Sequence, residues 1–60
     1  MFGIYCMTTE KFLDGNKWVH EVIFASKTDS LDEAKKLRSK IKRTDLLIVE
    51  IDGPDYWVID

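Results

Sequence analysis

The chain has 60 residues, of which 45% are hydrophobic and 33% are charged, and its formal net charge at pH 7 is −2. This length allows one domain, residues 1–60, and the composition is that of a folded globular chain rather than a disordered one. The single cysteine, Cys6, excludes an internal disulfide, and with the single histidine, His20, it offers too few soft ligands for a metal. We therefore expect no metal and no cofactor. Of the usual means of stabilising so small a core, association with a partner subunit is then the one that remains.

The apolar runs are far shorter than the roughly 18 residues that a membrane span needs, so we expect no membrane segment. The first residues, MFGIYCMTTE, contain neither a basic region nor a cleavage signal, so the sequence predicts no secretory leader. A lone unpaired cysteine fits a reducing compartment. We expect a cytoplasmic protein.

Two segments in the first half of the chain predict β-strands. Residues 2–9 and 17–25 are rich in β-branched and aromatic side chains and show no helical spacing. Between them Asp14-Gly15 predicts a two-residue hairpin turn, because glycine takes a positive φ without a steric penalty.

The register of this hairpin decides which side chains share a face, because a slip of one residue exchanges the two faces. With a two-residue turn Cys6 faces Ile23, and with a wider loop centred earlier Cys6 faces His20. We favour the tight turn, because Phe12 and Leu13 beside it suggest strands that continue to its tip.

Residues 30–43 predict the one helix. Ser30 can accept a hydrogen bond from the N–H of Glu33, whose carboxylate can reach back to the N–H of Ser30, and this pattern is a capping box. Acidic residues near the start and basic residues near the end suit the helix macrodipole. An apolar stripe at helical spacing predicts the face that lies on a sheet, and it consists of Leu31, Ala34, Leu37 and Ile41.

The end of the chain predicts two further strands. Residues 46–51 form a near-continuous apolar run, and residues 56–59 form a short last strand after the turn at 52–55. The order is therefore ββαββ, and the sequence predicts an α+β fold with a four-stranded, mainly antiparallel sheet and one helix packed on one face.

All the predicted strands carry apolar residues on both faces, yet one helix covers only one face of a sheet. The other face is then an exposed apolar patch, which on a protein surface usually marks an interface. The alternative is a strongly curled sheet that buries both faces itself. We favour the interface, and with it self-association as a homodimer.

Cys6 and His20 are the one pair that suggests nucleophilic catalysis, because a thiolate needs a nearby base. No group that would orient the histidine accompanies them, and a buried cysteine is commonly a small hydrophobe. We expect no catalytic residue and a protein that is not an enzyme.

Acidic residues concentrate after Thr44, where the chain has no Lys or Arg. Asp52 and Asp55 flank Gly53-Pro54, and a turn explains both, because Asp side chains bond to nearby backbone N–H groups. The functional interpretation is an acidic edge that binds a basic partner protein.

We predict that the protein-binding residues are Trp18, Asp52, Asp55, Tyr56 and Trp57. Trp and Tyr anchor protein interfaces, and the two carboxylates give charge complementarity. The predicted function is that of a small non-catalytic module that binds another protein.

The alternative function is nucleic-acid binding through the helix. Six of the nine basic residues lie in the predicted helix, opposite its apolar stripe, and we select Lys36, Lys40 and Arg43 as candidate phosphate contacts. A helix that lies on a sheet also needs a solvated outer face, which Lys and Arg provide. With a net charge of −2, long-range attraction to nucleic acid is not expected.

No motif matches a known family residue by residue. In size, acidity and lack of catalytic groups, the chain is similar to the small accessory proteins made by bacteriophages. That resemblance implies an inhibitor that binds a host protein and blocks it.

Overall fold

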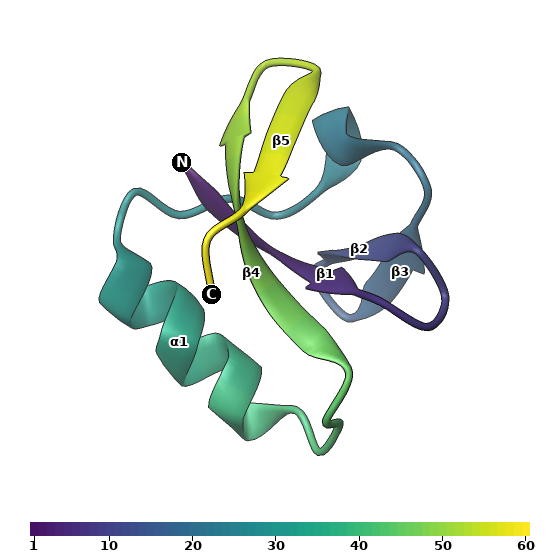
Figure 1. Cartoon of the computed structure of the whole chain (residues 1–60), viewed down its shortest axis with the longest axis vertical. Helices are drawn as coiled ribbons and strands as arrows, with labels where there is room; N and C mark the ends of the chain where they lie inside the picture. Colours follow the sequence, from purple (N-terminus) through teal and green to yellow (C-terminus); the bar gives the residue numbers. More distant parts are fainter.

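A computed structural model describes residues 1–60 as one helix on a five-stranded sheet of order β3-β2-β1-β4-β5 (Figure 1). All neighbouring strands are antiparallel. The elements in chain order are β1 (Phe2–Cys6), β2 (Lys11–Asp14), β3 (Lys17–Val19), the 3₁₀ turn η1 (Val22–Phe24), α1 (Leu31–Lys40), β4 (Leu46–Asp52) and β5 (Asp55–Val58). The predicted α+β class is confirmed, with one strand more than expected.

The additional strand arises because the chain reverses twice before the helix. The segment 7–10 already turns the chain after β1, with a positive φ of 57° at Glu10, and β2 then pairs back onto β1. The second reversal is a two-residue turn at Gly15 and Asn16, one residue later than predicted, where Gly15 has a φ of 63°. The expected strand over 17–25 ends at Val19.

Both predicted registers for Cys6 are wrong as a result. Cys6 lies opposite Lys11 in β2 and opposite Leu46 in β4, and it faces neither Ile23 nor His20. The hairpin signal was real, but it belongs to β2 and β3, which are too short to bring residues 20–23 beside β1.

Helix α1 begins as the sequence predicts and ends three residues early. The Ser30 hydroxyl accepts a hydrogen bond from the N–H of Glu33 at 3.3 Å. The N–H of Ser30 donates to the side chain of Thr28 at 3.2 Å instead of to the Glu33 carboxylate, so only half of the capping box forms. The helix ends at Lys40, with Ile41 as its C-cap. With ten residues, α1 lacks the length and the apolar character that a membrane-crossing helix requires.

The sheet is buried on both faces along its central strands. On the helix side, Ala34 packs with Ile4, Cys6, Leu13, Leu46 and Ile48, and Leu31 and Ile41 pack against this group. On the other side, a second cluster contains Phe12, Val22, Ala25, Val49 and Ile51. The neighbouring residues Ile48 and Val49 point to opposite faces and both have 0% of their surface exposed.

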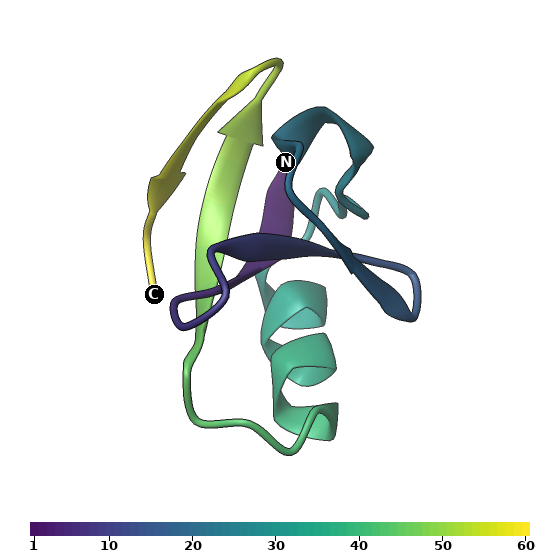
Figure 2. The same cartoon turned by 90° about the vertical axis from the view of Figure 1, so that its right-hand side faces the viewer.

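The chain itself covers the second face over β1 and β4, whereas Tyr56 and Val58, which follow on the same face, stay exposed. Strands β2 and β3 turn across β1, and the segment with η1 folds over the face of the sheet opposite α1 (Figure 2). Gly3 permits this approach, because a Cβ there would lie 2.7 Å from Cδ1 of Ile51 and 3.3 Å from the backbone oxygen of Ser26. A bridge between Phe2 and Thr28, with hydrogen bonds of 2.7 and 2.9 Å, fixes the segment that leads to α1.

We expect Ile48→Ala to lower the free energy of unfolding by about 2–5 kcal/mol, because it leaves a cavity where the side chain has no exposed surface. Urea unfolding monitored by circular dichroism measures the change. The matched control is Ile23→Ala in η1, whose side chain is exposed and whose loss we expect to cost less than about 0.5 kcal/mol. Equal losses in the two variants would contradict the burial of Ile48 in the core on the helix side.

Candidate protein-interaction surface

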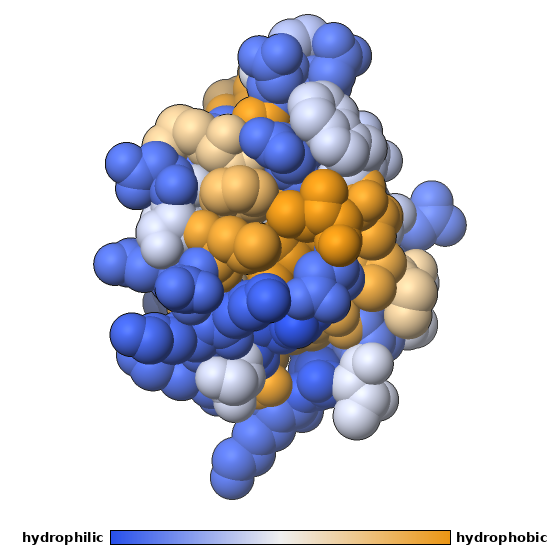
Figure 3. Space-filling view, turned by 60° about the vertical axis from the view of Figure 1, so that its left-hand side comes forward, coloured by the Kyte–Doolittle hydropathy of each residue, from blue (hydrophilic) through white to orange (hydrophobic).

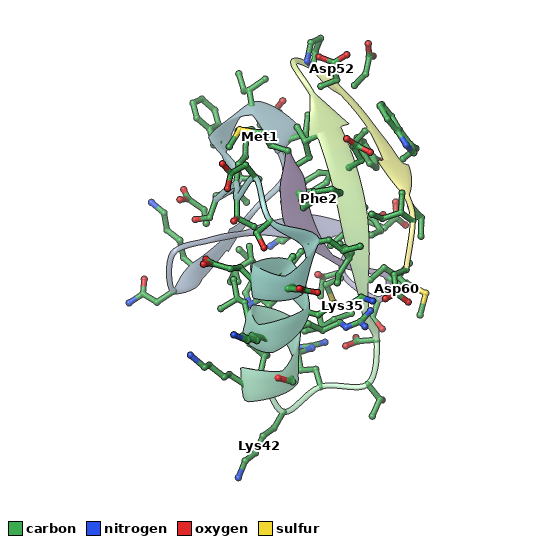
Figure 4. The ribbon with its side chains drawn as sticks, turned by 90° about the vertical axis from the view of Figure 1, so that its left-hand side faces the viewer. Met1, Phe2, Lys35, Lys42, Asp52 and Asp60 are labelled. Atoms are coloured by element: carbon green, nitrogen blue, oxygen red, sulfur yellow. The ribbon has the colours of Figure 1, made fainter.

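The C-terminal hairpin of β4 and β5 carries most of the predicted binding residues. Asp52 lies opposite Asp55, so Gly53 and Pro54 form the two-residue turn. Gly53 has a φ of 59°, and the proline that follows cannot take a positive φ, which identifies a type II′ turn. The turn places both carboxylates at the exposed tip, at the end of the hairpin far from Asp60 (Figure 4).

Strand β5 presents large apolar side chains to solvent on both of its faces. The exposed fractions are 43% for Tyr56, 48% for Trp57, 52% for Val58 and 39% for Ile59. Because side chains alternate along a strand, Trp57 shares a face with Glu50, while Tyr56 and Val58 share the face of Ile51 and Val49. β5 is an edge strand of the sheet, and Ile59 follows it directly.

Tyr56 is held on the core by two other rings. Its ring centroid lies 4.8 Å from that of Phe12 in an edge-to-face arrangement and 5.9 Å from that of Tyr5. Tyr5 and Phe12 in turn lie 5.1 Å apart. Burial is the main cause of a raised pKa for Tyr5. The exposed side of Tyr56 is therefore presented from a fixed position.

A β-bulge and an ion pair fix the other end of the strand. The carbonyl of Ile48 accepts from the N–H groups of Ile59 and Asp60 at 3.0 and 3.3 Å, and the N–H of Ile48 donates to the Asp60 oxygen at 2.9 Å. Arg38 donates to the same Asp60 oxygen at 2.6 Å, and Lys35 lies 3.6 Å from the Asp60 carboxylate (Figure 4). The end of β5 is thus tied to α1.

The side of the molecule that carries α1 and the end of β5 shows an apolar area across its middle (Figure 3). Charged groups border this area below, and polar groups lie above it. Leu37 of α1 is also exposed and lines a small apolar pocket between α1 and β1 with Phe2 and Ile4. That pocket has a volume of about 70 Å³, the space of a few water molecules.

The structure brings four of the five predicted protein-binding residues together. Asp52, Asp55, Tyr56 and Trp57 all lie in the β4–β5 hairpin. Trp18 lies in β3, at the opposite edge of the sheet, and packs half-buried against the core on the helix side. Sequence reasoning did not select Val58 and Ile59, although an uninterrupted YWVI run without a polar position signalled a strand with two apolar faces.

Two of the three candidate nucleic-acid contacts lie on the helix. Lys36 and Lys40 are exposed on α1, whereas Arg43 lies beyond the end of the helix. The Arg43 guanidinium donates two hydrogen bonds to the Asp45 carboxylate, at 2.8 and 2.7 Å. Arg38 and Lys35 are paired with Asp60.

Cys6 and His20 do not come together. Cys6 is buried in β1, with 1% of its surface exposed, and its thiol donates to Asp45 at 3.3 Å. His20 is exposed after β3, which is separated from β1 by β2. No group of three or more His, Cys, Asp or Glu side chains is placed to share a metal ion.

Asp45 connects the loop after α1 to the core. Its carboxylate accepts from Arg43, and its backbone oxygen accepts from the N–H of Met7 at 2.9 Å. The hydrogen bonds from Arg43 hold the pKa of the Asp45 carboxyl well below its usual range, with a smaller contribution from Thr8. The same contact raises the pKa of Arg43.

Comparison of the chain with protein-family models, with curated proteins and with solved structures gives no match. The proposed function therefore rests on the exposed residues of the chain.

The lowered pKa of Asp45 predicts a pH-dependent contribution to stability. The unfolded chain takes up the proton near pH 4, well above the pKa of the folded state, so the contribution is complete above about pH 4 and is lost as the pH falls further. We expect Asp45→Asn to lower the thermal midpoint at neutral pH and to differ less from the unsubstituted protein in strong acid. Thermal unfolding followed by circular dichroism at several pH values measures this.

The control is Glu21→Gln, an exposed carboxylate without an ion pair, which should leave the midpoint nearly unchanged. A difference between Asp45→Asn and the unsubstituted protein that stays constant with pH would contradict the interpretation.

Proposed function

We propose that the protein is a small non-catalytic module that binds another protein through the β4–β5 hairpin. The observation that carries this proposal is the run of four consecutive, exposed, large apolar side chains from Tyr56 to Ile59 on an edge strand. Single exposed apolar residues are normal on protein surfaces, but a contiguous group of this kind favours an interface.

The proposed surface is preorganised, which lowers the entropy that binding must overcome. Phe12 and Tyr5 hold the inner side of the Tyr56 ring. The bulge at Ile59 and the contacts of Asp60 with α1 hold the end of the strand. Trp57 then presents a rigid aromatic side chain, the kind of residue that most often dominates the binding energy of an interface.

The carboxylates at the tip favour a basic partner. Asp52 and Asp55 are exposed and make no ion pair within the chain. Charges on the rim of an interface mainly raise the association rate and exclude partners of like charge. The apolar strand would supply most of the affinity, and the acidic tip would select a partner surface that carries Lys or Arg.

The proposed action is steric. A module of this size with a rigid apolar strand would inhibit a larger host protein by occupying one of its surfaces, as the resemblance to phage accessory proteins implies. We also propose self-association, and a cytoplasmic location because Cys6 is a free thiol. Nucleic-acid binding through the helix is disfavoured, because the guanidinium groups of Arg38 and Arg43 are engaged with carboxylates.

Affinity capture with the purified protein as bait tests the proposal. We expect a specific host protein to be retained by the unsubstituted chain and lost with Trp57→Ala, with affinity falling by about 30-fold or more, as for a central aromatic residue of an interface. Asp52→Asn with Asp55→Asn should slow association and make it less sensitive to salt.

The matched control is Phe24→Ala, which removes an exposed aromatic side chain from η1, outside the hairpin. It should retain the same protein as the unsubstituted bait. Equal retention by Trp57→Ala, or the absence of any specifically retained protein, would refute the proposed function.

A further inference from the structure

The outer edge of β5 carries unpaired backbone groups. In the β4–β5 ladder, Ile59 bonds to Ile48, and hydrogen-bonded positions alternate along an antiparallel pair. The N–H and C=O of Trp57 therefore point toward β4, and those of Tyr56 and Val58 point away from the sheet. No other part of the chain bonds to these four groups.

The two edges of the sheet differ in how well they are protected. β3 has only three residues and begins with the exposed Lys17, and short strands with a lysine are poor templates for pairing. β5 has no basic residue, and the side chains from Tyr56 to Val58, together with Ile59 after the strand, are all large, apolar and exposed. The features that protect β5 from pairing with another strand are Pro54 before the strand and the bulge after it.

We infer that the outer edge of β5 pairs antiparallel with β5 of a second copy of this chain, so that two sheets join into one across a two-fold axis. The inference rests on the proposed function only in that it uses the same hairpin as an interface. It names a partner that the chain itself supplies.

One register of this pairing uses all of the available groups. With the axis at Trp57, Tyr56 of each copy lies opposite Val58 of the other. Both residues point their backbone groups outward, so the two pairs form four hydrogen bonds. An axis at Tyr56 would bring Val58 opposite Pro54, which has no N–H. An axis at Val58 would bring Tyr56 opposite Asp60, whose backbone is already bonded to Ile48.

The side chains are compatible with the same register. Tyr56 packs beside Val58 of the other copy, an aromatic and β-branched pair that stabilises antiparallel strands, and the two Trp57 rings meet at the axis. Asp55 lies opposite Ile59 of the second copy rather than opposite another Asp55. That end of β5 adjoins Lys35 and Arg38, whose cationic groups contact Asp60. The register therefore places the unpaired Asp55 carboxylate toward the end of the strand that lies beside these two cations.

The dimer should be weak and should compete with other partners. A strand of four residues buries an area at the low end of specific interfaces, so the dissociation constant should be micromolar or weaker. Because the dimer occupies the outer edge of β5, a protein that pairs with this edge must first displace the second copy.

Sedimentation velocity over a range of concentrations tests the pairing, with Val58→Pro as the main variant. The N–H of Val58 points outward, so proline removes an intermolecular bond without breaking the β4–β5 ladder. Val58→Thr keeps both the N–H and the β-branched shape and is the matched control. We expect the unsubstituted chain and Val58→Thr to dimerise at high concentration, and Val58→Pro to stay monomeric with an unchanged circular dichroism spectrum.

Cysteine cross-linking tests the register, and it decides the question if Val58→Pro does not fold. Trp57→Cys places two thiols across the axis at a non-hydrogen-bonded pair, where the Cα atoms lie about 4.5 Å apart, within the range of a disulfide. In Val58→Cys the two thiols are offset by two residues, which puts the Cα atoms more than about 7 Å apart. Copper phenanthroline with dissolved oxygen serves as the oxidant, and buried Cys6 gives the background in the unsubstituted chain.

We expect rapid formation of a disulfide-linked dimer with Trp57→Cys and little with Val58→Cys. A monomer at all concentrations, or equal cross-linking of both variants, would overturn the inference. Loss of host-protein capture with Trp57→Ala in a chain that never dimerises would refute the pairing alone. Dimerisation without any retained host protein would refute the proposed function alone.

Discussion

The fold depends on the burial of β4 on both of its faces. Ile48 and Val49 are neighbours in the chain, point in opposite directions and have no exposed surface. The helix covers the first, and the curled sheet with the segment around η1 covers the second. A flat sheet of this length could not enclose both residues, so the close approach at Gly3 and the turn of β2 and β3 across β1 are requirements of the core.

The small number of covering elements explains where the exposed apolar side chains lie. In a chain of 60 residues, these elements cover the central strands, β1 and β4, and they leave the edge strand β5 exposed. The helix packs mainly on β1 and β4 and meets the end of β5 at Asp60, and Tyr56 is supported from the other side by Phe12 and Tyr5. The proposed interaction surface is thus the apolar surface that the core leaves exposed, and the contacts of Asp60 with α1 hold the end of it in place.

Local signals in the sequence predicted the helix, its Ser30 cap, the last hairpin and the α+β class, because each depends on spacing within a few residues. The path of residues 7–25 was not predictable in the same way. Its apolar residues suit a long strand as well as they suit two short strands and a 3₁₀ turn, and the choice is made by contacts of Val22 and Ala25 with β4, far along the chain. The hydrogen bond of Ser30 with Thr28 shows a similar limit, since two partners competed for one N–H.

The contrast between features set by neighbouring residues and features set by distant contacts also applies to the surface. Tyr56, Trp57, Asp52 and Asp55 lie together because they are neighbours in sequence, whereas Trp18, which was selected as an aromatic residue like Tyr56 and Trp57, lies in β3. The contact of Arg43 with Asp45 could not be predicted from helical spacing. It forms in the loop that follows the helix, which ends at Lys40.

The unequal edges of the sheet also determine what kind of assembly the chain can build. If β5 could pair with β3 of the next molecule, each addition would leave a new free edge and growth would continue as a filament. The brevity of β3 and its lysine disfavour that head-to-tail contact. An association through β5 alone uses the one sheet edge of each molecule that favours pairing. No such edge is then left free, so the assembly would stop at two subunits.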